Sequence, residues 1–544
     1  MRVFISVFFI SLFSYAFLSA VNSTYPIAVI SNGRITATVY LPDPTNGHYL
    51  ASRFNRSSMA ASVIYDGHHF FGNFIQPHSP DATEGASGFA EEFSTPVGYD
   101  AAAPGGTFLK IGVGVLIKPD TKPYDFNRAY AISDGGRWAV NIGTSSISFS
   151  HYISSGPYQY HYRRRMSLSN ATVIITHELS NSGFTALASS HYAHNFILID
   201  GKAIDSAYEA GYNFNMMTGN RQQYLAAMGL NSIRFLRPFE KTDIYSLYPA
   251  GLLNNSNTAA YVYNSSAGAG IIIRPHYPVV RPFLFAVSNA VCPEFFFDIS
   301  CASKASVRWS TEYDFVSGAR PAFSPADITR NSKRGIAAIM IDGNGLAEYT
   351  LEKRSYSIVQ CAGDTHIPRI TAEPSDPKDS VRITQPSVTR AAVITYIAAD
   401  NSITNEYTVA LKKSAVYAVS ASMFGANPPI NTLDEDLDTS WSAEGEQWIS
   451  YDFGTPHGFT GIGIAWRSGN KRYYRFSIET GMDGKIWNMV FNGASGGRTN
   501  AVEPISFART VNARYIRIRG SGNNLNRWNN MTETIFLTPR GSIQ

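Results

Sequence analysis

The stretch Asn431–Trp441 reads NTLDEDLDTSW and concentrates carboxylates in the run Asp434–Asp438, with a threonine directly after it. Carboxylate, hydroxyl and carbonyl oxygens are the hard ligands that Ca²⁺ prefers, so this loop indicates a calcium site. Five further segments follow it in order along the chain. They are QWISYDFG (447–454), RYYRFSI (472–478), DGKIW (483–487), ARYIRI (513–518) and WNNMTE (528–533).

Together these segments resemble the discoidin-type (factor V/VIII type C) module, whose first motif is N-x-x-D-G-D-x-x-T-x-W. The resemblance covers the whole span 413–540 with its motifs in the family's order, which makes a chance match a poor explanation. It implies a jelly-roll sandwich that binds a glycan. It also implies that a structural calcium ion is shared by Asp434, Asp436, Thr439 and Glu533. One position departs from the family, because Glu435 stands where the motif has glycine, and a positive φ there would strain a residue with a side chain.

The resemblance places the sugar site in loops that carry aromatic and basic side chains. An aromatic face suits the C–H side of a pyranose, and charged groups suit its hydroxyls. The residues in question are Trp466, Arg467, Lys471, Arg472 and Trp528. Trp466 and Trp528 fit a core position as well as a ligand platform, and for Trp441, Trp448 and Trp487 we favour the core. The basic residues suit an acidic polysaccharide, although a solvated loop explains them equally well.

Upstream of the module, short strand-like segments alternate with Gly, Asn, Pro and Ser, and helical periodicity is nearly absent. Aromatic residues at 13%, with 43 Gly and 27 Pro, also favour an all-β chain rich in turns. The pattern predicts a large sandwich over 24–316, a linker over 317–333, and a small unit over 334–412. The small unit resembles Ig-like spacers of surface glycosidases in the segments IAAIMIDGNGLAEY, RSYSIVQC and NEYTVALKK.

The large N-terminal region resembles the galactose-mutarotase-like supersandwich, the fold of aldose 1-epimerases. Four segments carry this likeness: YLASRFN (49–55), GASGFAEEF (85–93), YAHNFILIDG (192–201), and CPEF (292–295) with ASVRWSTEYDF (305–315). Mutarotation needs one base and one acid on opposite sides of a sugar. The resemblance implies Glu294 as the base, His194 as the acid, and Arg53 as a group that holds the sugar.

Two observations keep other functions open. The family's first histidine is absent, with Glu84 near its place, and His69 is a candidate substitute that would contact the substrate. The same fold also serves polysaccharide lyases and glycosidases, and fold does not determine function. A catalytically silent, glycan-binding or adhesion protein is the third alternative. Glu294 is the hardest residue to explain structurally, since a carboxylate among apolar residues is costly unless paired or functional.

Several other residues have structural interpretations. Arg163 and Arg164 are expected at a solvated strand end with Arg165 turned inward, and His177 on an exposed strand face. Cys292 and Cys301 are close enough in sequence to bridge two neighbouring strands, which would leave Cys361 as a buried apolar residue.

The N-terminus predicts export. Arg2, the apolar run Val3–Phe17 and small residues at Ser19–Ala20 predict a signal peptide over 1–20. Six sequons are expected in surface loops, at Asn22, Asn55, Asn170, Asn254, Asn264 and Asn530. A net charge of +4 over 544 residues favours neither nucleic acid nor a membrane surface, and no later segment is apolar enough to span a bilayer. We therefore expect a secreted protein that binds an oligo- or polysaccharide and possesses, in one alternative, an epimerase-like activity.

Overall fold

The computed structural model describes residues 24–220, 222–252, 257–324, 326–328, 332–346, 349–387, 390–425 and 427–543. The predicted signal peptide and the sequons at Asn22 and Asn254 lie outside these residues. Regular structure in the described part is almost entirely β-strand, which confirms the all-β prediction. No described helix is long and apolar enough to cross a membrane.

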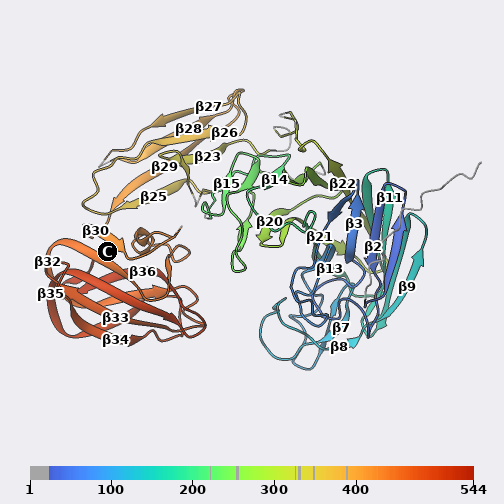
Figure 1. Ribbon diagram of the computed structural model, residues 1–544, viewed down its shortest axis with the longest axis horizontal. Coiled ribbons are helices and arrows are strands. Elements are labelled where there is room, and N and C mark those ends of the chain that lie inside the picture. The colour runs from blue at the N-terminus through green and yellow to red at the C-terminus, as the bar shows by residue number, and fades with distance from the viewer. Residues whose placement is uncertain are drawn as a thin grey trace, which may run out of the picture.

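The N-terminal part is built around a ten-stranded and a five-stranded sheet (Figure 1). The larger sheet has the order β15-β16-β14-β18-β19-β22-β12-β11-β10-β9. Its strands are β9 (Arg137–Ile142), β10 (Ser146–Ser155), β11 (Tyr158–Ser169), β12 (Thr172–Asn181), β14 (Tyr208–Tyr212), β15 (Ala226–Met228), β16 (Ser232–Phe235), β18 (Ala260–Asn264), β19 (Ala269–Pro275) and β22 (Ser306–Ser317).

The smaller sheet has the order β17-β20-β21-β13-β5. Its strands are β5 (Phe89–Phe93), β13 (Leu187–Asn195), β17 (Tyr245–Leu247), β20 (Arg281–Val287) and β21 (Ala290–Cys301). Two short sheets complete this part: β1 (Ile27–Ser31), β2 (Ile35–Tyr40), β3 (Ala60–Tyr65) and β4 (His68–Phe70); and β6 (Thr107–Lys110), β7 (Gly114–Ile117) and β8 (Ile132–Asp134).

The two large sheets pack face to face, because their inward side chains alternate with outward ones. Along β11 the aromatic residues Tyr158, Tyr160 and Tyr162 are buried, while the residues between them are not. Aromatic contacts join the sheets: Phe89 of β5 lies 4.6 Å from Tyr313 of β22, measured between ring centroids. The core of this part is therefore a sandwich of two β-layers.

The five-stranded sheet is covered on both faces. All five residues of β5 are buried, and so are the first eight of β21. A strand covered on both faces leaves no solvent side for a polar side chain, so each such side chain needs a partner within the protein. This property brings the polar residues of β5, β13 and β21 together.

The middle unit consists of two small sheets around a core of its own. They contain β23 (Ile336–Ile341), β24 (Asn344–Gly345) and β26 (Ile370–Pro374); and β25 (Ser355–Gln360), β27 (Ser380–Thr384), β28 (Ala392–Ile397) and β29 (Thr404–Lys413). Hydrogen bonds join it to both neighbours: Asn215 Nδ2 donates to the Ser375 carbonyl at 2.7 Å, and the Ser414 amide donates to the Gln360 carbonyl at 2.9 Å.

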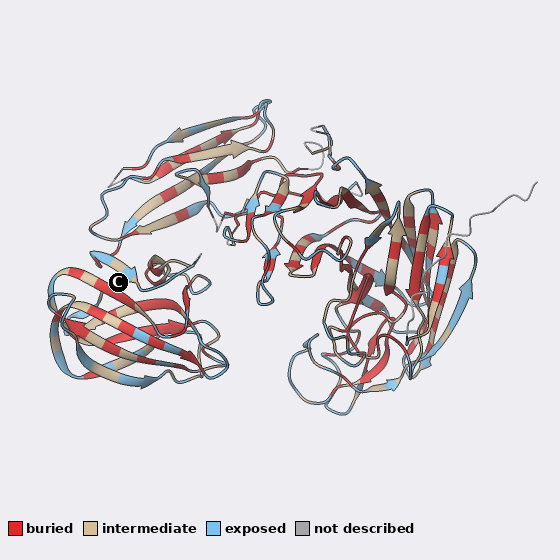
Figure 2. Cartoon of the chain, viewed as in Figure 1, coloured by how far each residue is buried: buried red, intermediate tan, exposed pale blue. Residues whose placement is uncertain are grey.

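The C-terminal unit is an eight-stranded sheet that encloses a separate core with Trp441 and Trp466 in it. Figure 2 shows buried and exposed positions alternating along its strands. A short 3₁₀ helix, η1 (Pro429–Thr432), precedes the acidic loop. The strands are β30 (Ala418–Ala421), β31 (Trp441–Glu444), β32 (Gln447–Trp466), β33 (Tyr474–Gly481), β34 (Asn488–Ala494), β35 (Glu503–Asn523), β36 (Trp528–Thr538) and β37 (Gly541–Ile543).

Some structural expectations were wrong. Cys292 and Cys301 both lie on β21 and are free thiols, because two residues nine positions apart on one extended strand cannot meet. Cys361 is half-buried against the core of the C-terminal unit. Trp448 and Trp487 are partly exposed rather than in the core.

Two of the expected glycosylation sites are also corrected. Asn55 and Asn264 are buried, since their side chains bond within the protein instead of facing solvent. Asn170 is exposed and Asn530 is half-buried.

Candidate functional site

A row of ionisable side chains crosses one face of the five-stranded sheet. Tyr192 on β13 is paired in register with Glu92 on β5, and His194 follows on the same face because side chains alternate along a strand. Glu294, on the next strand β21, lies with Oε1 3.2 Å from His194 Nδ1. All four side chains are buried.

Glu92 is the centre of this row. Its carboxylate accepts a hydrogen bond from Arg53 Nε at 3.0 Å, one from Lys110 Nζ at 2.7 Å, and one from the Tyr192 hydroxyl at 2.7 Å. Burial by itself would raise the pKa of Glu92, but the positive charges of Lys110 and Arg53 lower it below its ordinary value. Glu92 is therefore an ionised carboxylate that balances two buried cations.

His194 and Glu294 form a pair of a different kind. Burial raises the pKa of Glu294 well above its ordinary value, and burial with the nearby charge of Arg53 lowers the pKa of His194 well below its own. The rings of Phe54, Phe196 and Phe285 surround the imidazole, with Phe196 stacked on it at 4.3 Å. Burial thus disfavours the charged form of both groups.

The structure brings Arg53, His194 and Glu294 together but does not open them to solvent. They are 7%, 5% and 2% exposed, and the Arg53 guanidinium is covered by Phe126, whose ring centroid lies 4.3 Å away. The three described cavities border other residues. The three residues therefore form a buried cluster that exposes little of its polar surface to solvent.

His69 does not join this cluster. It lies on β4 with an exposed side chain, and its backbone amide donates to Asp200 Oδ1 at 2.9 Å. Its neighbour His68 pairs with the same carboxylate through Nδ1 at 2.9 Å. The two histidines therefore anchor β4 to the loop at Asp200, and His69 does not take the place of the missing histidine.

A second polar network occupies the opposite face of β5. Glu91 accepts from Arg164 Nε at 3.0 Å and lies 3.5 Å from His177 Nε2 and 3.9 Å from His191 Nε2. The expectation for the arginine run is thus wrong by one residue: Arg164 is buried, and Arg165 is exposed. His177 is buried as well, because the inward face of β12 packs against β5.

Sequence reasoning did not identify the roles of Glu91, Glu92 and Lys110. The signal was present in the run Phe89-Ala-Glu-Glu-Phe93, where two carboxylates stand among apolar residues. Glu91 and Glu92, like Glu294, are carboxylates among apolar residues, and such a carboxylate must be paired or functional.

In the C-terminal unit, a cluster of loops gathers basic and aromatic side chains at one end of the sheet. We call Arg467, Lys471, Arg472, Tyr473 and Trp528 the loop cluster. Hydrogen bonds tie its loops together: the Arg467 amide donates to the Asn530 carbonyl at 3.0 Å, and the Tyr473 amide donates to Asn524 Oδ1 at 3.0 Å. Trp528 and Tyr473 are each 39% exposed.

Trp466 is not part of this surface. It is buried and stacks on Tyr474 with ring centroids 4.5 Å apart. Trp466 is therefore a core residue and not a platform for a ligand. Tyr473 was not predicted from the sequence as a site residue, although it stands between Arg472 and a buried tyrosine at the start of β33.

Residues 415–534, which contain the loop cluster and the acidic loop, match the family model of the F5/8 type C domain. The C-terminal unit is an F5/8 type C domain. The matched residues lie within the predicted span, and they include the acidic loop, the strands β31 to β35 and the first part of β36.

Solved structures are similar to parts of the chain. A family 32 carbohydrate-binding module of AlyQ, in complex with 4,5-unsaturated mannuronic acid, is 42% identical and covers 22% of this chain and 95% of that chain, with a TM-score of 0.22. A pectin-binding carbohydrate-binding module is 27% identical and covers 23% of this chain and 93% of that one, with a TM-score of 0.22. A provisionally assigned aldose 1-epimerase from Escherichia coli K12 is 15% identical, covers 54% of this chain and 99% of that chain, and has a TM-score of 0.33. None of the curated protein sequences compared with the chain matches it.

The acidic loop of the F5/8 type C domain gathers oxygen atoms around Thr439. Its hydroxyl lies 2.7 Å from Asp434 Oδ2, 3.0 Å from the Asp436 carbonyl and 3.3 Å from the Asn431 carbonyl. Carboxylate, carbonyl and hydroxyl oxygens are of the hard kind that Ca²⁺ prefers, and the Asp436 carbonyl also accepts from the Thr439 amide at 3.2 Å. In the described residues no three His, Cys, Asp or Glu side chains are arranged around a metal position, so the loop would rely on carbonyl and hydroxyl oxygens.

Two further details bear on the predicted calcium site. Glu435 has a φ of 62°, the left-handed conformation for which the family's glycine is suited. Glu533 is buried on β36, and its Oε1 accepts from the Thr534 amide at 3.0 Å. The calcium assignment remains a prediction.

Proposed function

We propose that this protein binds an acidic polysaccharide through the loop cluster of its F5/8 type C domain. The observation that carries the proposal is that the segment with Arg467, Lys471 and Arg472 is hydrogen-bonded at Asn524 and Asn530 to the segment that carries the exposed Trp528. An indole face packs against the C–H side of a sugar ring, and a guanidinium pairs with a carboxylate through two parallel hydrogen bonds. A neutral sugar offers these cations hydroxyl acceptors but no charge to balance theirs.

The ligand class that we propose is a uronate polymer. The AlyQ module is described with an unsaturated mannuronic acid and the second module as pectin-binding, and both are acidic carbohydrates. For this chain the support is the charge of the loop cluster itself.

Calcium is part of the proposal. Arg467 Nη1 donates to the Asp438 carbonyl at 3.1 Å, so the acidic loop positions an arginine of the loop cluster. A cation held by the Asp434 carboxylate, the Asp436 carbonyl and the Thr439 hydroxyl would offset the loop's negative charge beside an anionic ligand. Removal of calcium should therefore weaken glycan binding as well as stability.

The test is isothermal titration of the intact protein with oligouronates and with a neutral oligosaccharide of equal length, with and without EDTA. We expect Arg467→Ala to weaken uronate binding about tenfold or more, since charge-assisted hydrogen bonds contribute about 1.5–3 kcal/mol. Trp528→Ala should weaken it about tenfold or more as well, because it removes the aromatic face that packs against the sugar ring. Matched controls are Arg382→Ala and Phe184→Ala, which remove an exposed arginine and an exposed aromatic residue elsewhere. Equal affinity of both loop variants and wild type would contradict the proposal.

A second candidate function is acid–base chemistry on a sugar by the N-terminal part. One observation favours it: His194 and Glu294 are adjacent, and their pKa values are shifted in opposite senses. Their burial favours instead a catalytically silent domain, and nothing in their geometry selects a lyase or hydrolase. Polarimetry of freshly dissolved α-hexoses with wild type and Glu294→Gln separates these possibilities, because equal rates would exclude the epimerase assignment.

We also propose that the protein is exported. The support is the charged and apolar N-terminal segment of the sequence. N-terminal sequencing of protein recovered from the culture medium tests this, and a retained Met1 would contradict it.

A further inference from the structure

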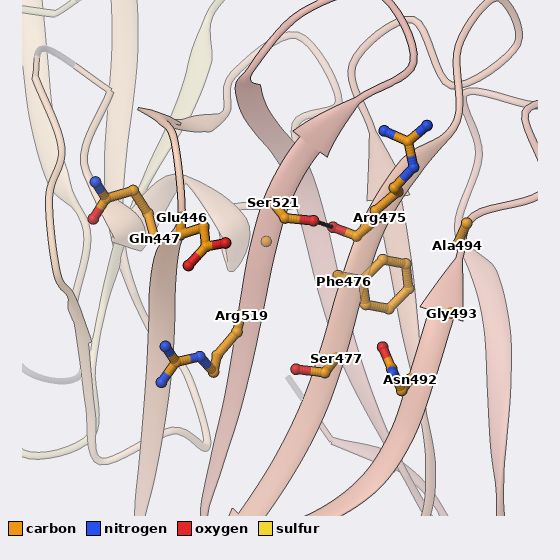
Figure 3. A pocket seen from close by; sticks show the side chains of 11 residues that line it. Glu446, Gln447, Arg475, Phe476, Ser477, Asn492, Gly493, Ala494, Arg519 and Ser521 are labelled. Atoms are coloured by element: carbon orange, nitrogen blue, oxygen red, sulfur yellow. Dashed lines mark hydrogen bonds between the residues drawn. The ribbon is translucent and has the colours of Figure 1, made fainter.

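A groove crosses the outer face of the F5/8 type C domain, separate from the loop cluster. Its cavity measures about 540 Å³, within the range of about 300–1,000 Å³ that is typical of ligand sites. Strands β33, β34 and β35 form its floor, and the polar side chains that border it include Glu446, Gln447, Arg475, Ser477, Asn492 and Arg519. Figure 3 shows Ser477 between Arg519 and Asn492, with Arg475 on another side of the groove.

Strand alternation explains why this face is polar. Phe476 and Ile478 of β33, together with Ile518 of β35, point into the core. Side chains alternate along a strand, so the residues next to these in the sequence face outward. Arg475, next to Phe476, and Arg519, next to Ile518, are two of them. The groove thus presents guanidinium, hydroxyl and amide groups.

The arginines of this sheet face differ in how their charge is balanced. Arg514 is paired with Asp452 and Arg517 with Glu479, at 2.8 and 2.6 Å. Among the described residues, Arg519 has neither an ion pair nor a hydrogen bond from its side chain. Arg475 contacts Tyr473, with its guanidinium 5.3 Å from the ring centroid and Nη2 3.4 Å from the hydroxyl oxygen. Two cations at the groove are thus available to an anionic ligand.

The groove begins where the loop cluster ends. Tyr473 belongs to the loop cluster and contacts Arg475, which lines the groove. The hydroxyl of Ser521, at the same edge, lies 3.4 Å from the Arg475 carbonyl. A chain of sugars that leaves the loop cluster over Tyr473 would therefore pass onto the groove.

We propose that this groove holds the continuation of the acidic polysaccharide bound at the loop cluster, with uronate carboxylates at Arg475 and Arg519. The inference rests on the proposed function and adds that the domain binds several consecutive sugars of a chain. Ser477, Asn492 and Gln447 would bond the sugar hydroxyls between the two arginines. Glu446 is the one acidic side chain at the groove, which sets the net charge of its border at +1 from Arg475, Arg519 and Glu446.

The test compares oligouronates of two and of six or more sugars by isothermal titration with the full-length protein. We expect the longer ligand to bind more tightly to wild type. Arg519→Ala should leave the affinity for the dimer unchanged and weaken the longer ligand about tenfold, which corresponds to about 1.4 kcal/mol. Arg519→Lys, which keeps the charge, should retain part of the length effect.

Arg467→Ala is the reference variant and should weaken both ligands. Arg519 is exposed, and unchanged thermal unfolding of Arg519→Ala will show that the fold is intact. If Arg519→Ala binds the long ligand like wild type, or weakens both lengths equally, the groove proposal is wrong while the loop cluster stands. If wild type binds no uronate of either length, the proposed function itself fails.

Discussion

His194 Nδ1 and Glu294 Oε1 face each other at 3.2 Å across two neighbouring strands, in a shell of phenylalanine rings. Burial raises the pKa of the carboxyl and lowers the pKa of the imidazole, so it disfavours the charged form of both groups. These shifts couple folding to pH, because the unfolded chain ionises at the ordinary pKa values.

The first prediction concerns Glu294→Gln. Above pH 4.5 the unfolded state loses the proton that the folded state keeps, so the Glu294 contribution to stability falls as pH rises toward its raised pKa. Glutamine removes this dependence. The unfolding free energy of Glu294→Gln relative to wild type should therefore increase as pH rises above 4.5, by up to about 1.4 kcal/mol per pH unit. Urea unfolding at several pH values measures it, and parallel pH profiles would contradict the assignment.

Three buried histidines predict acid instability of the N-terminal part. Burial lowers the pKa of His48 to about 3, that of His151 to about 4 and that of His177 to about 3. Below pH 6.5 the three histidines bind protons in the unfolded state but stay neutral in the folded state. Stability that is present above pH 6.5 is therefore lost as pH falls from 6.5 toward the lowered pKa values. Each histidine contributes up to about 1.4 kcal/mol per pH unit. Calorimetry from pH 7 to pH 4 should show this loss, with the F5/8 type C domain, which contains none of the three, as internal control.

The Glu91–Arg164 pair should be strongly coupled. Arg164→Met leaves a buried carboxylate without its main cation, and we expect a loss of about 3–5 kcal/mol. The double variant Glu91→Gln with Arg164→Met should recover part of that loss, because no uncompensated charge remains. Denaturant titration of the four proteins measures the coupling, and additive single effects would show that the pair is independent.

Glu435→Gly should stabilise the acidic loop by about 1 kcal/mol. The φ of 62° is unfavourable for glutamate and free for glycine. The substitution also removes an exposed contact between Glu435 and Lys412 Nζ at 2.9 Å, which contributes little. The control is Glu444→Gly on β31, where φ is not positive and glycine should destabilise. Thermal unfolding with calcium present compares the two, and a loss of stability in Glu435→Gly would contradict the strain argument.

The sequence was most informative where the relevant residues are close together along the chain. The acidic loop from Asn431 to Trp441 carries its motif within a single turn-rich segment, and the φ of Glu435 follows from its place in that motif. Strand alternation was likewise readable, which is why the all-β class could be predicted. Local geometry depends on neighbours a few residues away, and those neighbours are visible in the sequence.

Which side chains are buried, and with which partners they pair, depended on contacts that only the tertiary structure decides. Whether Trp466 faced the core or a ligand was open until its stacking on Tyr474 was known. Tyr192 meets Glu92 from a strand one hundred residues away, and Arg53 reaches the same carboxylate from a loop. Such pairs depend on strand register and on which face of a sheet is covered, and a shift of one residue would reverse every side chain. The sequence by itself therefore determined the β class, the acidic loop and the C-terminal module, whereas the tertiary structure decided that Arg53, His194 and Glu294 meet in a buried cluster.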